Sequence, residues 1–175
     1  MKQQVNIHYY NSPCGELVLA SVGDELCLCD WNEMPCAERN KRRLVRLLNA
    51  EFTTASSPVL EQTKQELGEY FAGKRKAFDI PLHPVGTDFQ KQVWQALLEI
   101  PYGETRTYKE IALRVNNLKG VRAVAQAIGA NGMSILIPCH RVIGTNHSLT
   151  GFAGGIEAKI LLLNIESKDS RNPLP

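Results

Sequence analysis

The chain has 175 residues, of which 43% are hydrophobic and 22% are charged. This composition excludes a disordered or fibrous chain, and the formal net charge of +2 excludes a protein that binds nucleic acid through its overall charge. No apolar run approaches the roughly 20 residues needed to cross a bilayer, and the first residues lack the apolar segment of a signal peptide. We therefore expect a cytoplasmic protein that does not bind membranes.

The cysteines indicate reduced thiols rather than a disulfide framework. Their number is odd, and four of the five lie within the first 36 residues, whereas a secreted disulfide framework is usually even and occupies a shorter chain. Zinc binding by the four early cysteines is the alternative, but their spacing fits no standard ligand pattern. We predict no metal site among Cys14, Cys27, Cys29, Cys36 and Cys139.

The first third of the chain is predicted to form a small β-sheet. Three stretches favour strands, and Gly23-Asp24 between the last two is typical of a hairpin turn. These stretches are Val5–Tyr10, Leu17–Ser21 and Leu26–Trp31.

Two helices are expected against this sheet. The first is basic and covers residues 37–50, and the second begins at Ser57-Pro58, an N-cap followed by proline, and stops at Gly73. The apolar stripe of the first helix is predicted to contain Leu44, Val45, Leu47 and Leu48, and that of the second Leu60, Leu67 and Phe71.

The segment Gly73–Gly86 is the best candidate for a linker between domains. It contains the basic triplet Lys74-Arg75-Lys76 and the turn-forming residues Pro81 and Pro84. We therefore predict a first domain over residues 1–82 and a second over residues 83–175.

The second domain is predicted to consist of short, well-capped helices. Thr87 to Gln90 and Thr107 to Glu110 have the pattern of capping boxes, and each opens a helix, the first ending before Pro101 and the second at Val115. After a turn at residues 116–120, an Ala-rich helix covers Val121–Ile128. Two short helices across a tight turn form a candidate helix-turn-helix.

The stretch Ile135 to Val142 carries the chemistry. A short apolar strand, Ile135–Ile137, is predicted to run into Pro138, which is followed directly by Cys139 and His140. A lone cysteine is usually structural, but a nucleophilic thiolate needs a neighbouring proton acceptor. Because adjacent side chains of an extended strand point apart, His140 must act through a water molecule, or the chain must turn there.

In this region the sequence closely resembles the O6-alkylguanine-DNA alkyltransferase family. The resemblance rests on Pro138-Cys-His-Arg-Val142 and covers essentially all of residues 87–166, with a looser match before them. It extends to Phe89-Gln-Lys-Gln-Val-Trp94, Ile100-Pro-Tyr-Gly103, Thr107-Tyr108, Val121-Arg-Ala-Val124, Gly151-Phe-Ala-Gly-Gly155 and Leu161-Leu-Leu-Asn-Ile-Glu166.

The resemblance implies an α+β protein that repairs DNA. A small ribonuclease H-like sheet domain with helices would precede a winged helix-turn-helix-like domain that binds DNA and accepts the alkyl group. Cys139 would take a methyl or other alkyl group from O6 of guanine, with O4 of thymine left open as a second substrate. His140 would take the thiol proton through a water, and Glu166 would orient the imidazole. The reaction would occur once per molecule, and we expect it to need no cofactor.

The resemblance also implies how DNA is held. The partner is double-stranded DNA containing O6-alkylguanine, bound by a monomer that flips the damaged base out of the duplex. Arg122 would fill the space that the base leaves, and Tyr108 would crowd its phosphate. The predicted DNA-binding residues are Tyr108, Arg122, Ala123 and Arg141, and the predicted pocket residues are Asn131, Pro138, Phe152, Ala153 and Gly154. Asn131 would be a hinge with an unusual backbone angle.

The sequence departs from the family pattern at two places. Residues 132–134 are Gly-Met-Ser where many members have prolines, and Phe152-Ala153 stand where some have Tyr-Ser, which makes the pocket less polar.

Two other protein classes are the alternatives to a repair enzyme. The first is a DNA-binding regulator without chemistry, which would not need Cys139. The second is a thiol hydrolase or redox enzyme, but the chain has no C-x-x-C motif.

Overall fold

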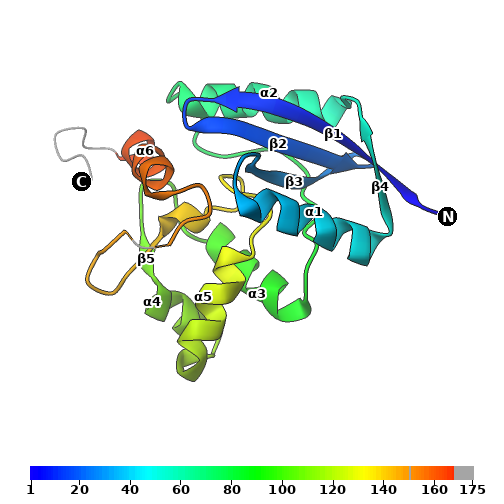
Figure 1. Cartoon of the computed structure of the whole chain (residues 1–175). Helices are drawn as coiled ribbons and strands as arrows, with labels where there is room; N and C mark the ends of the chain where they lie inside the picture. Colours follow the sequence, from blue (N-terminus) through cyan, green and yellow to red (C-terminus); the bar gives the residue numbers. More distant parts are fainter. Residues whose placement is uncertain (150, 168–175) are drawn as a thin grey trace. The chain divides into compact units, whose positions relative to one another are not determined.

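The computed structural model describes residues 1–149 and 151–167. The chain divides into two compact units, Met1–Gly86 and Thr87–Pro175 (Figure 1).

The first unit contains a four-stranded sheet with strand order β3-β2-β1-β4. Its strands are β1 (Gln3–Ser12), β2 (Gly15–Val22), β3 (Glu25–Trp31) and β4 (Ala50–Thr54). β2 is antiparallel to both of its neighbours, whereas β4 is parallel to β1. The three predicted strands and the hairpin at Gly23 are confirmed, and the positive φ of 56° at Gly23 explains the glycine there. β4 was not predicted, because a short edge strand with mostly exposed residues carries little apolar pattern.

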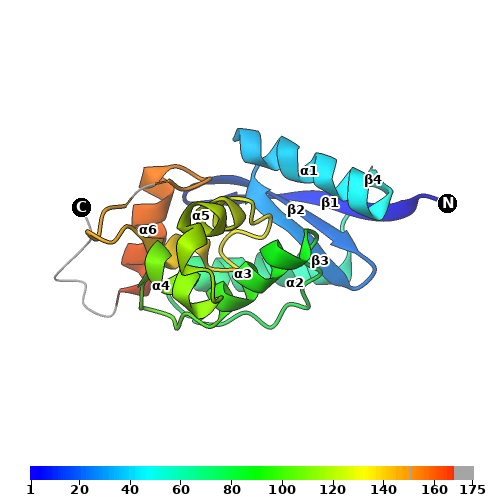
Figure 2. The same ribbon diagram turned by 90° about the horizontal axis from the view of Figure 1, so that it is seen from below.

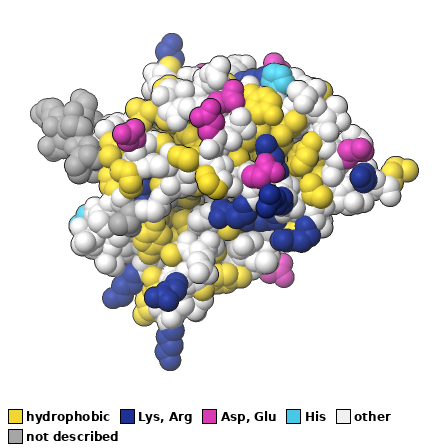
Figure 3. Space-filling model, viewed as in Figure 1, with side chains coloured by type: hydrophobic (Ala, Val, Ile, Leu, Met, Phe, Trp, Pro, Cys, Tyr) yellow, Lys and Arg dark blue, Asp and Glu magenta, His cyan; other side chains and the backbone are white. Residues whose placement is uncertain are grey.

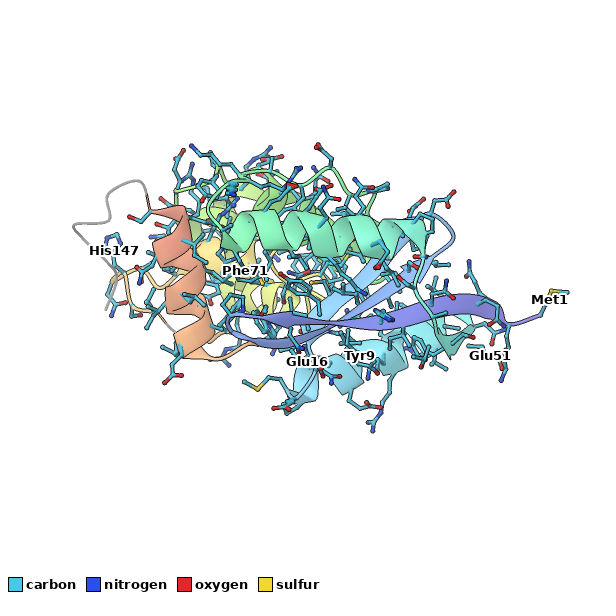
Figure 4. All side chains as sticks on the ribbon, turned by 90° about the horizontal axis from the view of Figure 1, so that it is seen from above. Met1, Tyr9, Glu16, Glu51, Phe71 and His147 are labelled. Carbon is cyan, nitrogen blue, oxygen red and sulfur yellow. The ribbon has the colours of Figure 1, made fainter. Side chains whose placement is uncertain are left out.

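Two helices cover opposite faces of this sheet: α1 (Pro35–Leu48) and α2 (Pro58–Phe71) (Figures 1 and 4). Alternate residues of β2 face each helix. Val18 and Ala20 belong to the core cluster that contains Leu44 of α1, while Ser21 bonds through its hydroxyl to Ser57, the cap of α2. All of β2 from Leu17 to Val22 is therefore buried.

The apolar stripe predicted for α1 is only half correct. Leu44 is buried in the core, but Val45 and Leu47 are 48% and 49% exposed. Leu48 packs partly against the same core as Leu44. Lys and Arg side chains occupy other positions of α1, and Figure 3 shows a group of Lys and Arg side chains on the face in view. Four neighbouring apolar residues cannot all face the sheet, because successive helix positions are about 100° apart.

The start of α2 is as predicted, and its last turn is not. The Ser57 hydroxyl accepts a hydrogen bond from the Leu60 amide, and Pro58 is the first helical residue. At the other end Tyr70 is fully buried, whereas Phe71, at the C-terminal end of the helix (Figure 4), is only partly buried. Gly73 follows the helix with a φ of 75°, as expected for a helix stop.

The segment predicted as a linker packs against β3 within the first unit. The Leu26 amide donates to the Pro81 carbonyl at 2.9 Å, and the His83 amide donates to the Leu26 carbonyl at 2.7 Å. Ile80 and Val85 are buried. Prolines suit such a position, since proline tolerates the edge of a sheet where its missing N–H is not needed.

The second unit begins with three helices: α3 (Asp88–Leu98), α4 (Tyr108–Arg114) and α5 (Val121–Gly129). Both predicted capping boxes are present, with Thr87 and Gln90 at α3 and Thr107 and Glu110 at α4. α4 and α5 lie side by side across a turn (Figures 1 and 2) that contains a 3₁₀ segment, Leu118–Gly120. The Trp94 indole N–H donates to the Ala127 carbonyl at 2.8 Å and fixes α3 to α5.

The rest of the described second unit brings α6 to the Cys139 segment. β5 (Arg106–Thr107) pairs in parallel with β6 (Val142–Ile143), and α6 (Ile156–Glu166) packs against the 3₁₀ turn Cys139–Arg141. No helix within residues 1–149 and 151–167 is long and apolar enough to cross a membrane.

Candidate active site

The segment leading to Cys139 is a series of turns, so the predicted strand Ile135–Ile137 is wrong. Ile135 has a φ of 74°, which is strained for a β-branched residue. The Ile137 amide donates to the Met133 carbonyl at 2.9 Å, and the Cys139 amide donates to the Ile137 carbonyl at 2.8 Å across Pro138, forming an inverse γ-turn. A short apolar run predicts burial correctly, but it does not specify which backbone groups bond to one another.

The Asn131 side chain forms hydrogen bonds to both ends of this turn. Its amide nitrogen donates to the Ile137 carbonyl at 2.9 Å, and its oxygen accepts from the Met133 amide at 3.0 Å. The unusual backbone angle expected at Asn131 lies instead at Ile135. Asn131 therefore positions the segment through its side chain.

We expect Asn131→Ala to lower the free energy of unfolding by about 1–3 kcal/mol, because it removes the acceptor of the buried Met133 amide and one of the two donors to the Ile137 carbonyl. Urea denaturation measures this loss. The exposed amide Gln126 on α5 is the matched control, and Gln126→Ala should change stability by less than about 0.5 kcal/mol. Equal urea midpoints for Asn131→Ala and Gln126→Ala would contradict this role of the Asn131 hydrogen bonds.

The chain turns at Cys139, as one of the two sequence alternatives required. The 3₁₀ turn Cys139–Arg141 buries three consecutive side chains, with Cys139 7%, His140 0% and Arg141 8% exposed. Three polar or reactive side chains in a row are thus held inside the second unit.

His140, Arg141 and Glu166 form one buried network. His140 Nε2 lies 2.7 Å from Glu166 Oε2. Arg141 donates to both oxygens of Glu166, from Nε at 2.7 Å and from Nη2 at 3.1 Å, and its Nη1 donates to the Ile100 carbonyl at 2.7 Å. The Arg141 guanidinium also lies 5.7 Å from the centre of the Tyr102 ring. Such a two-point arginine–carboxylate contact fixes the carboxylate in place.

The network holds Glu166 ionised and His140 neutral. Burial would raise the pKa of Glu166, but the hydrogen bonds from His140 and Arg141 outweigh it and lower the pKa to about 2. Burial lowers the pKa of His140. The hydrogen bond and the charge of Glu166 oppose this shift, and the positive charges of Arg141 and Lys159 add to it. A neutral His140 that donates from Nε2 to Glu166 has a lone pair on Nδ1. Nδ1 is buried and has no hydrogen-bond partner among the described residues, so it can accept a proton.

A narrow cavity of about 40 Å³ reaches Cys139. Of the predicted pocket residues, Asn131, Phe152 and Ala153 line it, whereas Pro138 and Gly154 do not. A larger cavity of about 310 Å³, between α3 and α4, is lined by neither a thiol nor an imidazole. The residues lining the narrow cavity are Tyr108, Ala125, Ile128, Gly129, Asn131, Cys139, Gly151, Phe152 and Ala153.

Both units match models of known protein domains. Residues 5–84 match the ribonuclease-like domain of 6-O-methylguanine DNA methyltransferase, and residues 88–168 match its DNA binding domain. The chain belongs to the O6-methylguanine-DNA methyltransferase family. The mixed α+β fold is that of solved structures from this family.

Relatives and solved structures agree with this family assignment. The methylated-DNA–protein-cysteine methyltransferase of Haemophilus influenzae is 45% identical over 90% of this chain and 84% of its own. The constitutive enzyme of Bacillus subtilis is 44% identical over 91% and 96%. The crystal structure of the Mycobacterium tuberculosis O6-methylguanine methyltransferase has a TM-score of 0.80 and 38% identity over 98% of this chain and 96% of that one. The same organism's protein in complex with DNA gives a TM-score of 0.78 at 38% identity, covering 97% and 95%.

The structure separates the DNA-binding residues expected from the family into three groups. Arg122 and Ala123 are exposed at the start of α5. Tyr108, the first residue of α4, lines the cavity, and burial followed by the charge of Cys139 raises the pKa of its hydroxyl. The expectation that Arg141 binds DNA must be corrected. Its guanidinium is buried against Glu166 and Ile100 and is not part of a DNA-binding surface.

Burial raises the pKa of three thiols other than Cys139. All five cysteines are thiols, none of them in a disulfide. Burial raises the pKa of Cys27 to about 12, and burial followed by the charge of Asp30 does the same to Cys36. Burial also raises the pKa of Cys14. These thiols are poor nucleophiles at neutral pH.

Lys159 is a polar group of the site that sequence reasoning missed. It is 0% exposed, and its Nζ donates to the Val142 carbonyl at 2.6 Å. Burial lowers its pKa to about 8, although the charge of Cys139 opposes that shift. The available signal was its position in an otherwise apolar helix, seven residues and therefore two turns before Glu166.

Proposed function

We propose that this chain repairs DNA by transferring an alkyl group from O6 of guanine to its own Cys139, once per molecule. The observation that carries the proposal is the 3₁₀ turn at Cys139. It places the sulfur at a narrow cavity, and its next residue, His140, is hydrogen-bonded to Glu166. The family membership and the methyltransferase relatives support the same reaction.

The transfer is a single displacement. A lone pair of the Cys139 sulfur forms a bond to the alkyl carbon, and the bond from that carbon to O6 breaks with its electron pair on the oxygen. Guanine then takes up one proton. The product is a thioether, which water does not hydrolyse readily, so one protein molecule is consumed for each base repaired.

His140 and Glu166 prepare the sulfur. The lone pair on Nδ1 of the neutral imidazole receives the thiol proton, directly or through a water, and the proton leaves to solvent. Glu166 holds the ring by its Nε2 hydrogen bond and is itself held by Arg141. This is the arrangement of a base oriented by a third group.

The substrate base must leave the duplex to reach Cys139. We place α5 against DNA, with Arg122 filling the vacated stack and Tyr108 beside the flipped nucleotide. The exposure of Arg122 and the position of Tyr108 at the cavity support these roles, as does the relative solved with DNA. A reactive thiol also needs a reducing compartment, so we propose that the protein acts in the cytoplasm, and as a monomer.

Incubation with duplex DNA carrying O6-methylguanine labelled in its methyl group tests the function. We expect stoichiometric transfer of label to the protein, found by mass spectrometry as one methyl group on the peptide containing Cys139. Binding to DNA without transfer would favour a regulator. Neither binding nor transfer would favour a thiol hydrolase or redox enzyme.

Arg122→Ala should slow repair of duplex DNA about tenfold or more and repair of a single strand less, because unstacking a paired base costs a few kcal/mol. Reaction with the free base O6-benzylguanine should barely change, since nothing is flipped. Rates on the three substrates measure this. Lys119→Ala, which removes a nearby exposed cation, is the control and should weaken DNA binding modestly and lower its salt dependence, without a selective loss on the duplex. Equal losses on all three substrates would contradict the role given to Arg122.

A further inference from the structure

The positive charge of the chain is concentrated in α1. This helix carries five of the 20 Lys and Arg residues but only one of the 18 Asp and Glu residues. The rest of the chain therefore has 15 basic and 17 acidic residues, a formal charge of −2, against +2 for the whole chain. Without α1 the protein would be acidic, which is unfavourable for binding a polyanion such as DNA.

Four arginines of α1 lie on one face of the helix. Successive residues are about 100° apart around a helix, so positions separated by three, four and seven residues fall within an arc of ~100°. Three of the four side chains are exposed, and that of Arg43 is partly exposed. α1 lies on the near side of the sheet in Figure 1, and Figure 3 shows a group of Lys and Arg side chains on the face in view. The four residues are Arg39, Arg42, Arg43 and Arg46.

The arginines of this face repel one another. Burial lowers the pKa of Arg43, and the charges of Arg39 and Arg46 lower it further, against the opposing charge of Asp30. Within residues 1–149 and 151–167, the side chains of Arg42 and Arg46 make no ion pair or hydrogen bond. Like charges three or four positions apart destabilise a helix, so folding alone does not favour this arrangement. An anion bound along the face would relieve the repulsion.

The chemistry and length of this face suit the phosphate backbone of DNA. A guanidinium group can donate two parallel hydrogen bonds to one phosphate. Seven residues of helix separate Arg39 from Arg46, which is a rise of about 10 Å. Phosphates of one strand follow one another about every 3.4 Å along the axis of B-DNA, so a face of this length can contact two or more of them.

A membrane is the other large anionic surface that a basic helix can bind, and the structure disfavours it. Helices that lie on membranes bury their apolar face in the lipid. The apolar face of α1 is packed on the sheet, with Ala37 and Leu44 in the core. The exposed Val45 and Leu47 are isolated positions beside charged ones, so the observations favour DNA.

We propose that the arginine face of α1 binds the phosphate backbone of the substrate duplex and gives the first unit a part in holding DNA. This inference rests on the proposed function, in which duplex DNA is the substrate. The contact carries no direct sequence information, because it is made to phosphates and not to base edges. It adds affinity for undamaged and damaged duplexes alike, while base flipping remains a task of the second unit.

The test is the salt dependence of binding to a fluorescent undamaged duplex, measured by anisotropy from about 50 to 300 mM salt. Arg42→Ala/Arg46→Ala removes two exposed cations, and alanine preserves the helix. The slope of log affinity against log salt should become shallower by about 1.8, which is about 0.9 for each lost phosphate contact. At 0.1 M salt the affinity should fall about tenfold or more. Arg42→Lys/Arg46→Lys keeps the charges and should retain most of the wild-type slope.

Lys74→Ala/Lys76→Ala is the matched control. It removes two exposed cations of the same unit that lie outside α1, so the net charge changes equally. Its slope should stay within about 0.5 of wild type, and circular dichroism checks that each variant is folded. An unchanged slope for Arg42→Ala/Arg46→Ala, or an equal change for the two double alanine variants, would overturn the proposal.

This test and the test of alkyl transfer can fail separately, because binding is measured without any transfer. If labelled methyl is transferred from DNA but the slopes coincide, only this inference fails. If the arginine-dependent slope is observed without transfer, only the proposed function fails. Arginine-dependent binding to phosphatidylserine vesicles, with no change in the DNA slope, would assign the face to membranes and overturn the proposal.

Discussion

Cys139→Ser is expected to abolish transfer of labelled methyl from DNA while leaving the affinity for duplex DNA within about twofold. A serine hydroxyl is too weakly acidic to supply a nucleophile where a thiolate is needed. The substitution is nearly isosteric, and the surface helix α5 is not altered. Label transfer and a binding assay on the same DNA measure the two effects.

Cys14→Ser is the matched control, because Cys14 is the least buried of the other cysteines. It should transfer label at the wild-type rate. Peptide mapping that found the alkyl group on Cys14, Cys27, Cys29 or Cys36 would overturn the assignment of Cys139.

Glu166→Gln is expected to lower the free energy of unfolding by about 3–5 kcal/mol, because it leaves the buried Arg141 without its charge partner. It should also slow transfer more at neutral than at high pH, since a thiol ionises without help when the pH is high. Urea denaturation and pH–rate profiles measure these effects.

The same carboxylate makes stability depend on pH. Its pKa is about 2 in the folded protein and roughly 4.3 when unfolded, so it binds its proton more weakly in the fold. Its contribution is present above about pH 4.3 and is lost as the pH falls towards 2, on the order of 3 kcal/mol in all. Glu166→Gln should remove this part of the acid sensitivity.

Glu157→Gln is the control for both measurements, since Glu157 is exposed on the same helix. It should leave stability within about 0.5 kcal/mol of wild type. An equal slowing of transfer by Glu166→Gln at every pH would mean that Glu166 acts only in folding.

Features that depend on neighbours in sequence could be predicted. The capping boxes at Thr87 and Thr107 are complete within four residues, so their helix starts were predicted at the observed positions. The hairpin at Gly23 is equally local. The residues of the candidate site, by contrast, were predicted mainly through the family resemblance. Glu166 on its own is simply an acid at the end of a helix.

Features that depend on what packs nearby could not be predicted. Nothing around Arg141 in the sequence reveals that its partners are Ile100 and Glu166, 41 and 25 residues away. Lys159 is buried because α6 packs on the Cys139 turn, which is a tertiary property. The turn at Ile135 was missed because a short apolar run has the same pattern in a buried strand and in a buried turn.

The parallel pairing of β5 with β6 limits where the chain can change in length. Arg106 pairs with Val142 and Thr107 with Ile143, so Tyr108 and Cys139 each stand a fixed number of residues from this ladder. A residue inserted between Thr107 and Tyr108, or one gained or lost between Cys139 and Val142, would shift the register and turn side chains to the opposite face. An insertion or deletion between residues 144 and 149 leaves both intervals intact. Evolution, or an engineer adding a reporter peptide, can therefore vary the length there without separating the thiol from the tyrosine beside it.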